Sequence, residues 1–519
     1  MGQILLQYKR PDPTTWVYMS SFLTIGLFFV FHRFWSIRNL DILLLILLAP
    51  GLLMVHEGYR RQLIQAEAVA KHNAESHEGK TTSVKAVSSR SKTRPVFAVA
   101  QVGPPVAVVQ EADADRTTDN DPASVGESIE DELKSSVPIA NYPPSDIRRW
   151  GFIYLFLLES FLLVRLLLDP LMVRRPLLDP NLTIGGLNFI GISLFIFMMA
   201  NVVASTPRIQ VTQGPALGPG YAMMNLLPSI PTRPNRFARR ESAPPSNSQL
   251  TPSQTRLANI AKTLAIFAHF AIVSGMVLIA DRHFSNLKAG VGCATLYLLL
   301  PYTAQMTGRV DHALPAALLL WAVLWYRKPM VAGIFLGLAG GLVYYPLFLL
   351  PLWCSFYWKR GVRPFAIGVI AMLALLMIAL SFDNSALLTE HLQRMFGILN
   401  PNKDASELRG IWGLGWNPIW RLPVIMAFAI LSLFFTVWPA QKNLGTLLSG
   451  SAALMVAAQF WHGHGGGLYI AWFLPLLLLS IFRPNLQDRI ATKVVIGGGK
   501  DSSATSTGAA HSGAELEPV

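Results

Sequence analysis

One apolar stretch of the chain carries three ionisable side chains in places where a membrane interior disfavours them. Glu159 lies within Leu-Leu-Glu-Ser-Phe-Leu-Leu-Val-Arg, Arg165 ends that string, and Asp169 closes the run. Arg165 and Asp169 have the i, i+4 spacing that places two side chains on one face of a helix, where they can pair. Because charge facing lipid is costly, all three are expected to face protein or water. Glu159 then either lines a cavity or fixes helix packing as a hydrogen-bonding group.

The loop that follows reads Asp169-Pro-Leu-Met-Val-Arg-Arg-Pro-Leu-Leu-Asp179-Pro. Its two carboxylates could supply a general base, and Arg174 with Arg175 could clamp an anion. In the alternative interpretation, Asp-Pro is only a common turn dipeptide and the arginines extend their charged heads to the membrane surface. Both interpretations stay open.

A third group of charges, Arg309, Asp311 and His312, stands at the entrance of an apolar run. Downstream, glycines at 333, 337 and 341 have the small-xxx-small spacing that lets helices approach closely in lipid. Prolines at 346 and 351 are expected to kink or break the continuation. Packing alone can explain the glycines, and an Arg-Asp pair at an interface is often structural.

Tryptophans and cations gather again in residues 383–420, which include Arg409, Trp412 and Trp416, with Arg421 directly after them. Cationic side chains at a membrane interface can hold a lipid phosphate, and indoles can stack on the apolar faces of sugars. Tryptophan also gathers at headgroup level in any membrane protein, so an aromatic belt is the alternative.

Two histidines, His462 and His464, stand in a glycine-rich segment before the last apolar run. They could contact a phosphate or an acceptor, or form a polar cap. No motif supplies a third metal ligand, so a divalent metal is unsupported and no cofactor is expected.

The composition decides what kind of protein positions these residues. Of the 519 residues, 52% are apolar and only 14% are charged, well below the roughly 25% of soluble domains. The net charge of +13 comes largely from basic residues that flank apolar runs, as membrane topology requires, so nucleic acid is not an expected partner. Cys293 and Cys354 both lie in apolar stretches, which excludes a disulfide framework and a cysteine-based zinc site.

The chain is therefore expected to be an all-α, polytopic integral membrane protein. About 20 apolar residues cross a bilayer, and this rule gives about twelve transmembrane helices. They are expected near residues 16–34, 39–56, 149–168, 187–205, 258–280, 288–306, 310–326, 330–353, 363–382, 421–439, 444–461 and 468–482.

Two polar interruptions, rich in Ser, Pro and segregated charge, are expected to be disordered. They divide the chain into an N-terminal two-span segment (1–56), a disordered cytoplasmic linker (57–147), a two-span segment with an outer acidic loop (148–205), a disordered basic loop (206–257), a multi-span membrane domain (258–483) and a disordered tail (484–519).

Basic loops indicate the orientation. With the N-terminus in the cytoplasm, residues 57–147, 206–257 and the tail lie inside, whereas 169–186, 383–420 and 462–467 lie outside. A break of 330–358 into two helices at Pro346 would reverse the parity of everything downstream. The expected location is the inner or plasma membrane.

The order Gly308-Arg-x-Asp-x-x-Leu-Pro-Ala, a short basic turn, Ala332-Gly-x-x-x-Gly-Leu, Tyr345-Pro and Leu349-Leu-Pro-Leu resembles the GT-C superfamily. Within it, the chain resembles the polyprenol-phosphate-mannose-dependent mannosyltransferases. The resemblance implies a multi-span enzyme that moves a mannose-like sugar from a polyprenyl-phosphate donor to a lipid or glycan acceptor on the outer face. The chain departs from the family at Val343, where a lysine is usual, and in having two extra spans before its first outer loop.

This resemblance assigns roles to the candidate residues. Asp169, then Asp179, would be the general base in the first outer loop, and Asp311 would replace them if the parity of the spans were different. The negative charge of the departing lipid phosphate would be stabilised by Arg174, Arg175, Arg409 or Arg421. The remaining candidates for substrate binding are Glu159, Arg165, Arg309, His312, Trp412, Trp416, His462 and His464.

A transporter or lipid flippase without catalysis is the alternative. In that protein Glu159, Arg165 and Asp311 would line a pathway and no bond would be cleaved. A scaffold whose disordered loops recruit partners is a third class.

Overall fold

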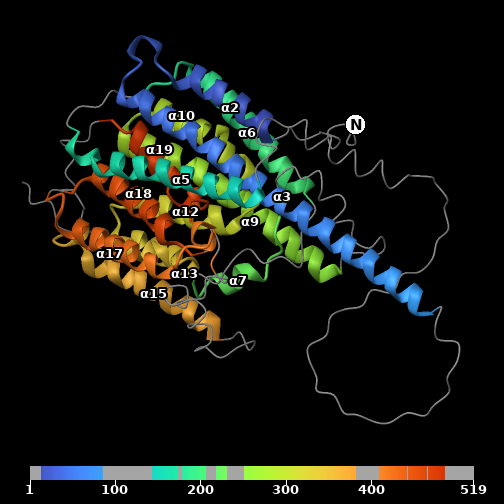
Figure 1. Cartoon of the computed structure of the whole chain (residues 1–519). Helices are drawn as coiled ribbons and strands as arrows, with labels where there is room; N and C mark the ends of the chain where they lie inside the picture. Colours follow the sequence, from blue (N-terminus) through green and yellow to red (C-terminus); the bar gives the residue numbers. More distant parts are fainter. Residues whose placement is uncertain are drawn as a thin grey trace, which may run out of the picture.

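The computed structural model describes residues 13–85, 143–172, 178–205, 218–230, 251–381, 408, 410–440, 442–463 and 466–484, and these residues contain helices and no β-strand (Figure 1). The first helices are α2 (Pro13–Phe28), α3 (Ile37–Lys85), α5 (Pro144–Leu167), α6 (Ile184–Ala204), α7 (Tyr221–Asn225), α9 (Pro252–Ile279), α10 (Leu287–Leu299) and α11 (Pro301–Met306). The later helices are α12 (Val310–Leu324), α13 (Pro329–Leu342), α14 (Leu350–Tyr357), α15 (Val362–Ser381), α17 (Arg421–Val437), α18 (Leu444–Trp461) and α19 (Leu474–Phe482).

Seven of the described helices are long and apolar enough to cross a membrane, and they lie within α3, α5, α6, α9, α15, α17 and α18. Four more apolar helical stretches are shorter, at 10–17 residues: Leu287–Leu299, Val310–Leu324, Pro329–Leu342 and Tyr345–Tyr357. The expected class, an all-α multi-pass membrane protein, is confirmed. The expected count of about twelve spans is not established, since several elements are too short to cross a bilayer unaided.

Side-chain caps set where several helices begin. Thr251 and Gln254 form a reciprocal capping box at the start of α9, with Pro252 in the first turn. Asn443 and Thr446 do the same for α18. These caps satisfy backbone N–H groups that have no partner within the helix. They also explain why α9 begins at Pro252 rather than at the expected residue 258.

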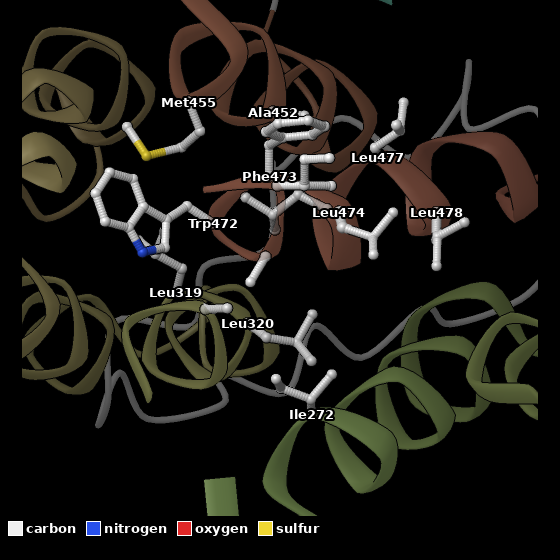
Figure 2. Close-up of a cluster of buried hydrophobic side chains, with 14 of the residues drawn as sticks. Ile272, Leu319, Leu320, Ala452, Met455, Trp472, Phe473, Leu474, Leu477 and Leu478 are labelled. Carbon is white, nitrogen blue, oxygen red and sulfur yellow. The ribbon is translucent and has the colours of Figure 1, made fainter. Parts of the chain in front are cut away.

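The interior of the bundle is built around α18, of whose spanning window 94% is buried. Figure 2 shows part of this core, where side chains from α9, α12, α18 and the C-terminal helix meet: Ile272, Leu319, Leu320, Ala452, Met455, Trp472, Phe473, Leu474, Leu477 and Leu478. In contrast α6, α15 and α17 expose large apolar side chains such as Phe189, Ile370 and Ile430. An apolar outer surface is the pattern of helices that face lipid.

Close contact between α13 and α15 depends on glycine. A methyl group added at Gly333 would collide with the backbone carbonyl of Phe365, and one at Gly368 would collide with that of Met330. The small-xxx-small spacing seen in the sequence therefore brings two backbones together, as packing between helices in lipid favours.

The chain reverses direction between α13 and α14. After Leu342 it leaves the helix at Val343 and forms a short 3-10 turn at Tyr345–Leu349 before α14. The Tyr357 hydroxyl at the end of α14 donates to the backbone oxygen of Tyr326, 2.5 Å away, in the turn before α13. Residues 330–358 are thus two antiparallel helices, and the parity of all later spans changes.

Because of this reversal, it is wrong that residues 57–147 and 383–420 lie on opposite sides of the membrane, and that residues 169–186 and the tail do so. Arg149, just after the linker expected inside, stacks on Trp416 of the 383–420 segment expected outside, with its guanidinium carbon 5.8 Å from the ring centre. Likewise Asp169, expected outside, pairs with Arg483 at the start of the tail expected inside. Each pair lies at one end of the bundle.

Two stretches expected to be disordered are in fact folded in part. Helix α3 continues to Lys85, so residues 57–85 are helical, and the last turns of α3 extend past the neighbouring helices (Figure 1). Residues 218–230 of the basic loop include α7, and the N–H of Gly220 donates to the backbone oxygen of Gly341, 2.9 Å away. Composition missed both, because it records polarity and shows neither the continuation of α3 nor the contact of Gly220. Residues 86–142, 206–217, 231–250 and 485–519 lie outside the described part.

The two ends of the bundle are named here by their carboxylates. The Asp169 end holds Asp169, Asp179 and Arg483, next to the start of α18 at Gly445. The Asp311 end holds Asp311 with the C-terminal end of α18, at Trp461 and His462. A rise of 1.5 Å per residue separates Gly445 from Trp461 by about 24 Å along α18.

Labelling of single cysteines tests this arrangement. In a background with Cys293 and Cys354 replaced by alanine, Ser145→Cys and Trp416→Cys should react with a membrane-impermeant maleimide from the same side, because both positions are exposed at the Asp311 end. Lys359→Cys, in the exposed turn between α14 and α15, should react only from the other side. Labelling of positions 145 and 416 from opposite sides would contradict the reversal between α13 and α14.

Candidate functional site

Asp311 is a fully buried carboxylate in the first turn of α12, held by an arginine two residues before it. The Arg309 guanidinium donates twice, from Nε to Oδ1 at 2.8 Å and from Nη2 to Oδ2 at 2.6 Å. Tyr221 of α7 donates its hydroxyl to Oδ2 at 3.2 Å. A two-pronged arginine contact of this kind fixes both the charge and the orientation of a carboxylate.

The protonation of the groups around Asp311 follows from these contacts. Burial raises the pKa of the Tyr221 phenol well above its usual value, and the Asp311 charge raises it further. Burial alone lowers the pKa of the Arg309 guanidinium, but the charge of Asp311 outweighs that effect and the net pKa is raised. Tyr221 therefore stays a neutral donor and Arg309 stays cationic.

His312 lies beside the same carboxylate. Its Nε2 is 3.7 Å from Asp311 Oδ2, and its Nδ1 shares a hydrogen bond of 2.5 Å with the Tyr302 hydroxyl. With the hydroxyl as donor, Nε2 carries the ring proton and directs it toward the carboxylate side.

The turn that presents Arg309 is fixed from behind by buried polar groups. The His269 imidazole of α9 contacts the backbone oxygen of Thr307 through Nε2 at 3.1 Å and the Tyr297 hydroxyl through Nδ1 at 2.9 Å. The Thr307 hydroxyl donates to the oxygen of Thr303. These contacts tie the α11–α12 turn to α9 and α10, so the start of α12 is rigid.

A continuous set of stacked rings, here called the aromatic bridge, begins at His312. Tyr469 lies 4.6 Å from both His312 and His462, and His462 lies 4.9 Å from Tyr345, measured between ring centres. Trp472 lies 4.4 Å from Tyr469, and its Nε1 donates to the backbone oxygen of Asp311 at 3.2 Å. The bridge joins α12, the 3-10 turn after α13 and the start of the last helix.

Arg421 lies at the far side of the aromatic bridge. It is fully buried at the start of α17, and its Nη2 donates to the backbone oxygen of Trp461 at 3.1 Å. The phenols of Tyr344 and Tyr345 are close enough to interact electrostatically with the guanidinium. The Asp311 end therefore holds a buried carboxylate and a buried cation, connected through aromatic rings.

Arg165 and Asp169 occupy the other end of the bundle. Arg165 contacts Asp41 of α3 through two hydrogen bonds, at 2.7 and 2.8 Å, and Asp169 through one at 2.9 Å. Arg483 also pairs with Asp169. The predicted pairing of Arg165 with Asp169, in the short 3-10 turn after α5, is confirmed. It belongs to a buried four-residue network of ion pairs that sequence spacing could not reveal, because Asp41 and Arg483 are distant in the sequence.

Asp179, the second carboxylate of that loop, is at the protein surface. Its side chain pairs with Lys288 at 2.9 Å, and its backbone oxygen accepts a hydrogen bond from Arg38. The structure therefore separates Asp169 and Asp179 from Asp311, and only Asp311 lies among histidines, tyrosines and tryptophans.

Glu159 differs from every other candidate. It is buried as predicted, at 0% exposure, but neither carboxyl oxygen has a hydrogen-bond partner among the described residues. A methyl group added at Gly467 would lie 3.7 Å from its Oε2, and the ring of Phe156 stands next to the same glycine.

The two loop tryptophans have different surroundings. Trp412 is buried, and its Nε1 donates to the backbone oxygen of Phe460 at 3.0 Å, which fixes the 410–413 turn onto α18. Trp416 is partly exposed and stacks under Arg149. Arg174, Arg175, Arg409 and His464 lie outside the described residues.

Several residues of the site were missed by the sequence analysis: Tyr221, Tyr302, Tyr345, Tyr469 and Trp472. Tyr345 stands in the Tyr-Pro motif and Tyr469 follows the histidines, so each carried a local signal. Tyr221 had none, because it lies in a segment whose composition indicates disorder. In the described part of the chain, no three His, Cys, Asp or Glu side chains are grouped as a metal site.

Comparisons of the chain with protein-family models, with curated proteins and with solved structures find no match. The geometry described above is therefore the basis for any functional assignment.

The buried network at the Asp169 end should be required for stability. Asp169→Asn keeps the shape of the side chain but leaves Arg165 and Arg483 with one carboxylate between them, so it should cost about 3 kcal/mol and lower the melting temperature of the purified protein. Asp179→Asn is the matched control, because a surface pair contributes about 1 kcal/mol or less. Equal melting temperatures for the two variants would contradict this role of Asp169.

Proposed function

We propose that this protein is an integral-membrane glycosyltransferase of GT-C type that uses a polyprenyl-phosphate sugar as donor. The observation that carries the proposal is the Asp311 end, where a buried carboxylate and the buried Arg421 lie on either side of the aromatic bridge. Such a transferase needs a group that accepts the proton of the acceptor hydroxyl, a cation that binds the donor phosphate and aromatic rings that stack on the sugar. Asp311, Arg421 and the aromatic bridge are the candidates for these three roles.

Asp311 is the general base in this proposal. The acceptor hydroxyl oxygen attacks the anomeric carbon of the donor sugar and loses its proton to the Asp311 carboxylate. The bond between that carbon and the phosphate oxygen breaks, and its electron pair stays on the departing polyprenyl phosphate. A positioned base contributes about 10² to 10⁴ in rate.

The second requirement is stabilisation of the leaving phosphate, whose negative charge grows as the glycosidic bond breaks. Arg421 supports this role, because a guanidinium buried among aromatic rings acts more strongly on a developing charge than one in water. The neighbouring phenols of Tyr344 and Tyr345 add hydroxyl donors.

Asp311 replaces Asp169 as the proposed base for two reasons. The reversal between α13 and α14 places the loop of Asp169 at the opposite end from the aromatic rings. Asp169 also accepts hydrogen bonds from two arginines, both buried, which leaves its carboxylate occupied in the ion-pair network. Asp311 has one arginine, and its other neighbours, Tyr221 and His312, are neutral or titratable groups.

A transporter or flippase is the second candidate, and Glu159 is the observation that favours it. A buried carboxylate without a described partner inside a membrane helix is common along transport pathways. Arg165, the other residue expected on such a pathway, is paired with Asp41 and Asp169 instead.

The proposal predicts that Asp311→Asn abolishes sugar transfer. The purified protein is added to extracted membranes that supply the acceptor, and incorporation of radiolabelled mannose from polyprenyl-phosphate-mannose is measured. Because Asn is nearly isosteric but accepts no proton, the rate should fall by about 10²-fold or more. Asp281→Asn, an exposed carboxylate near the Asp169 end, should transfer like the parent.

Two results would count against the enzyme. Transfer by Asp311→Asn at the parental rate would remove Asp311 from the mechanism. Absence of transfer by the parent, combined with movement of a fluorescent polyprenyl phosphate across proteoliposomes, would favour the flippase.

A further inference from the structure

Glu159 is a buried carboxyl group whose hydrogen-bonding capacity is not used by the described residues. It lies on α5 with 0% exposure, and both Oε1 and Oε2 lack a hydrogen-bond partner there. A methyl group added at Gly467 would lie 3.7 Å from the Oε2 of Glu159 and 3.3 Å from the Phe156 ring. Phe156 itself packs edge-on against Phe460 of α18, with ring centres 5.2 Å apart.

An arrangement of this kind is unfavourable in either protonation state. A buried carboxylate without donors loses its hydration and gains nothing in return, and a buried carboxylic acid would leave its O–H without an acceptor. A leucine or methionine would fit the same place at lower cost. The position therefore suits a carboxyl group that a ligand completes.

The surroundings of Glu159 connect it to the site at the Asp311 end. The N–H groups of Gly467 and Tyr469 both donate to the Gln459 side-chain oxygen at 3.3 Å, which fixes this segment against α18. Gly467 lies near Glu159, and Tyr469 belongs to the aromatic bridge. Glu159 thus lies near the segment that supplies Tyr469 to the aromatic bridge.

Arg421 contacts the other part of the same stretch of chain. Its Nη2 donates to the backbone oxygen of Trp461, and a methyl group added at Gly463 would lie 3.2 Å from that nitrogen. Arg421 therefore lies near Trp461 and Gly463, and Glu159 lies near Gly467, in the described parts of one short segment. In a polyprenyl-phosphate sugar the ring is bonded directly to the phosphate, so a phosphate at Arg421 brings its sugar to this stretch.

We propose that Glu159 recognises the sugar of the donor by accepting hydrogen bonds from its ring hydroxyls, an inference that rests on the proposed function. An ionised carboxylate accepts hydrogen bonds at two oxygens and so matches two neighbouring hydroxyl groups. Phe156 and Phe460 supply apolar surface beside it for the C–H faces of the ring. Glu159 binds and orients the sugar, and it takes no part in the proton transfer assigned to Asp311.

The test separates recognition of the sugar from recognition of the lipid phosphate. The melting temperature of the full-length purified protein is measured with polyprenyl-phosphate-mannose and with polyprenyl phosphate that carries no sugar. The parent should be stabilised more by the sugar-bearing lipid. Glu159→Met and the isosteric Glu159→Gln should lose that difference, with at least a tenfold weaker apparent affinity for the sugar-bearing lipid, and should keep the shift given by the bare lipid phosphate.

Two matched variants complete the test. Arg421→Met should lose the shift with both lipids, because the phosphate contact is gone. Glu57→Gln removes a carboxylate on α3 that pairs only with Arg60 and Arg61 in the described part of the chain, and should behave like the parent. Glu159→Met replaces an unsatisfied carboxyl by an apolar side chain of similar length, so the protein without ligand should melt at or above the parental temperature. Glu159→Gln serves as the test if the Met variant does not fold.

Three results would overturn the inference. A sugar-dependent difference that persists in both Glu159 variants would show that Glu159 does not read the sugar. A Glu159-dependent shift with sodium or magnesium chloride alone would reassign the carboxylate to a cation. If the parent shows no sugar-dependent difference, the inference fails, and the transfer assay with Asp311→Asn then decides separately whether the proposed function also fails.

Discussion

The rest of this structure depends on one constraint, which is that a buried charge needs a partner. Inside a membrane bundle no water is at hand to solvate an ion, so a charged side chain needs a counter-ion or hydrogen bonds from the protein or from a ligand. Arg165 finds Asp41 and Asp169, and Asp311 finds Arg309. The first network joins α3, α5 and the end of α19, whereas the second is local to the start of α12.

The same constraint distinguishes structural from functional charge. The network around Asp169 has two cations and two carboxylates, all buried and bonded to one another. The Asp311 end instead combines one ion pair with a buried arginine on the other side of stacked rings. Charged side chains that are fully paired with one another hold helices together. Charged side chains beside aromatic rings can also bind a substrate.

Short-range relations were predictable from the sequence. Apolar runs located the helices, the four-residue spacing predicted the Arg165–Asp169 pair, and the neighbouring positions of Arg309, Asp311 and His312 predicted a cluster. Longer-range relations were not predictable, since nothing in the sequence connects Asp41 to Arg165 or Tyr221 to Asp311. Composition also misjudged residues 57–85, whose polar side chains are compatible with a helix that extends beyond the bundle.

The sequence alone determined that the chain is a helical multi-pass membrane protein, because hydrophobic length and charge frequency are properties of single segments. Capping residues such as Thr251 and Asn443 are present in the sequence, but the apolar pattern placed the start of α9 at residue 258 and not at Pro252. Only the tertiary structure decided which loops share an end of the bundle and which carboxylate meets which arginine. The reason is that one reversal of the chain, between α13 and α14, inverts the direction of every later helix. The contact between Tyr357 and Tyr326 that demonstrates this reversal forms only when the chain has folded.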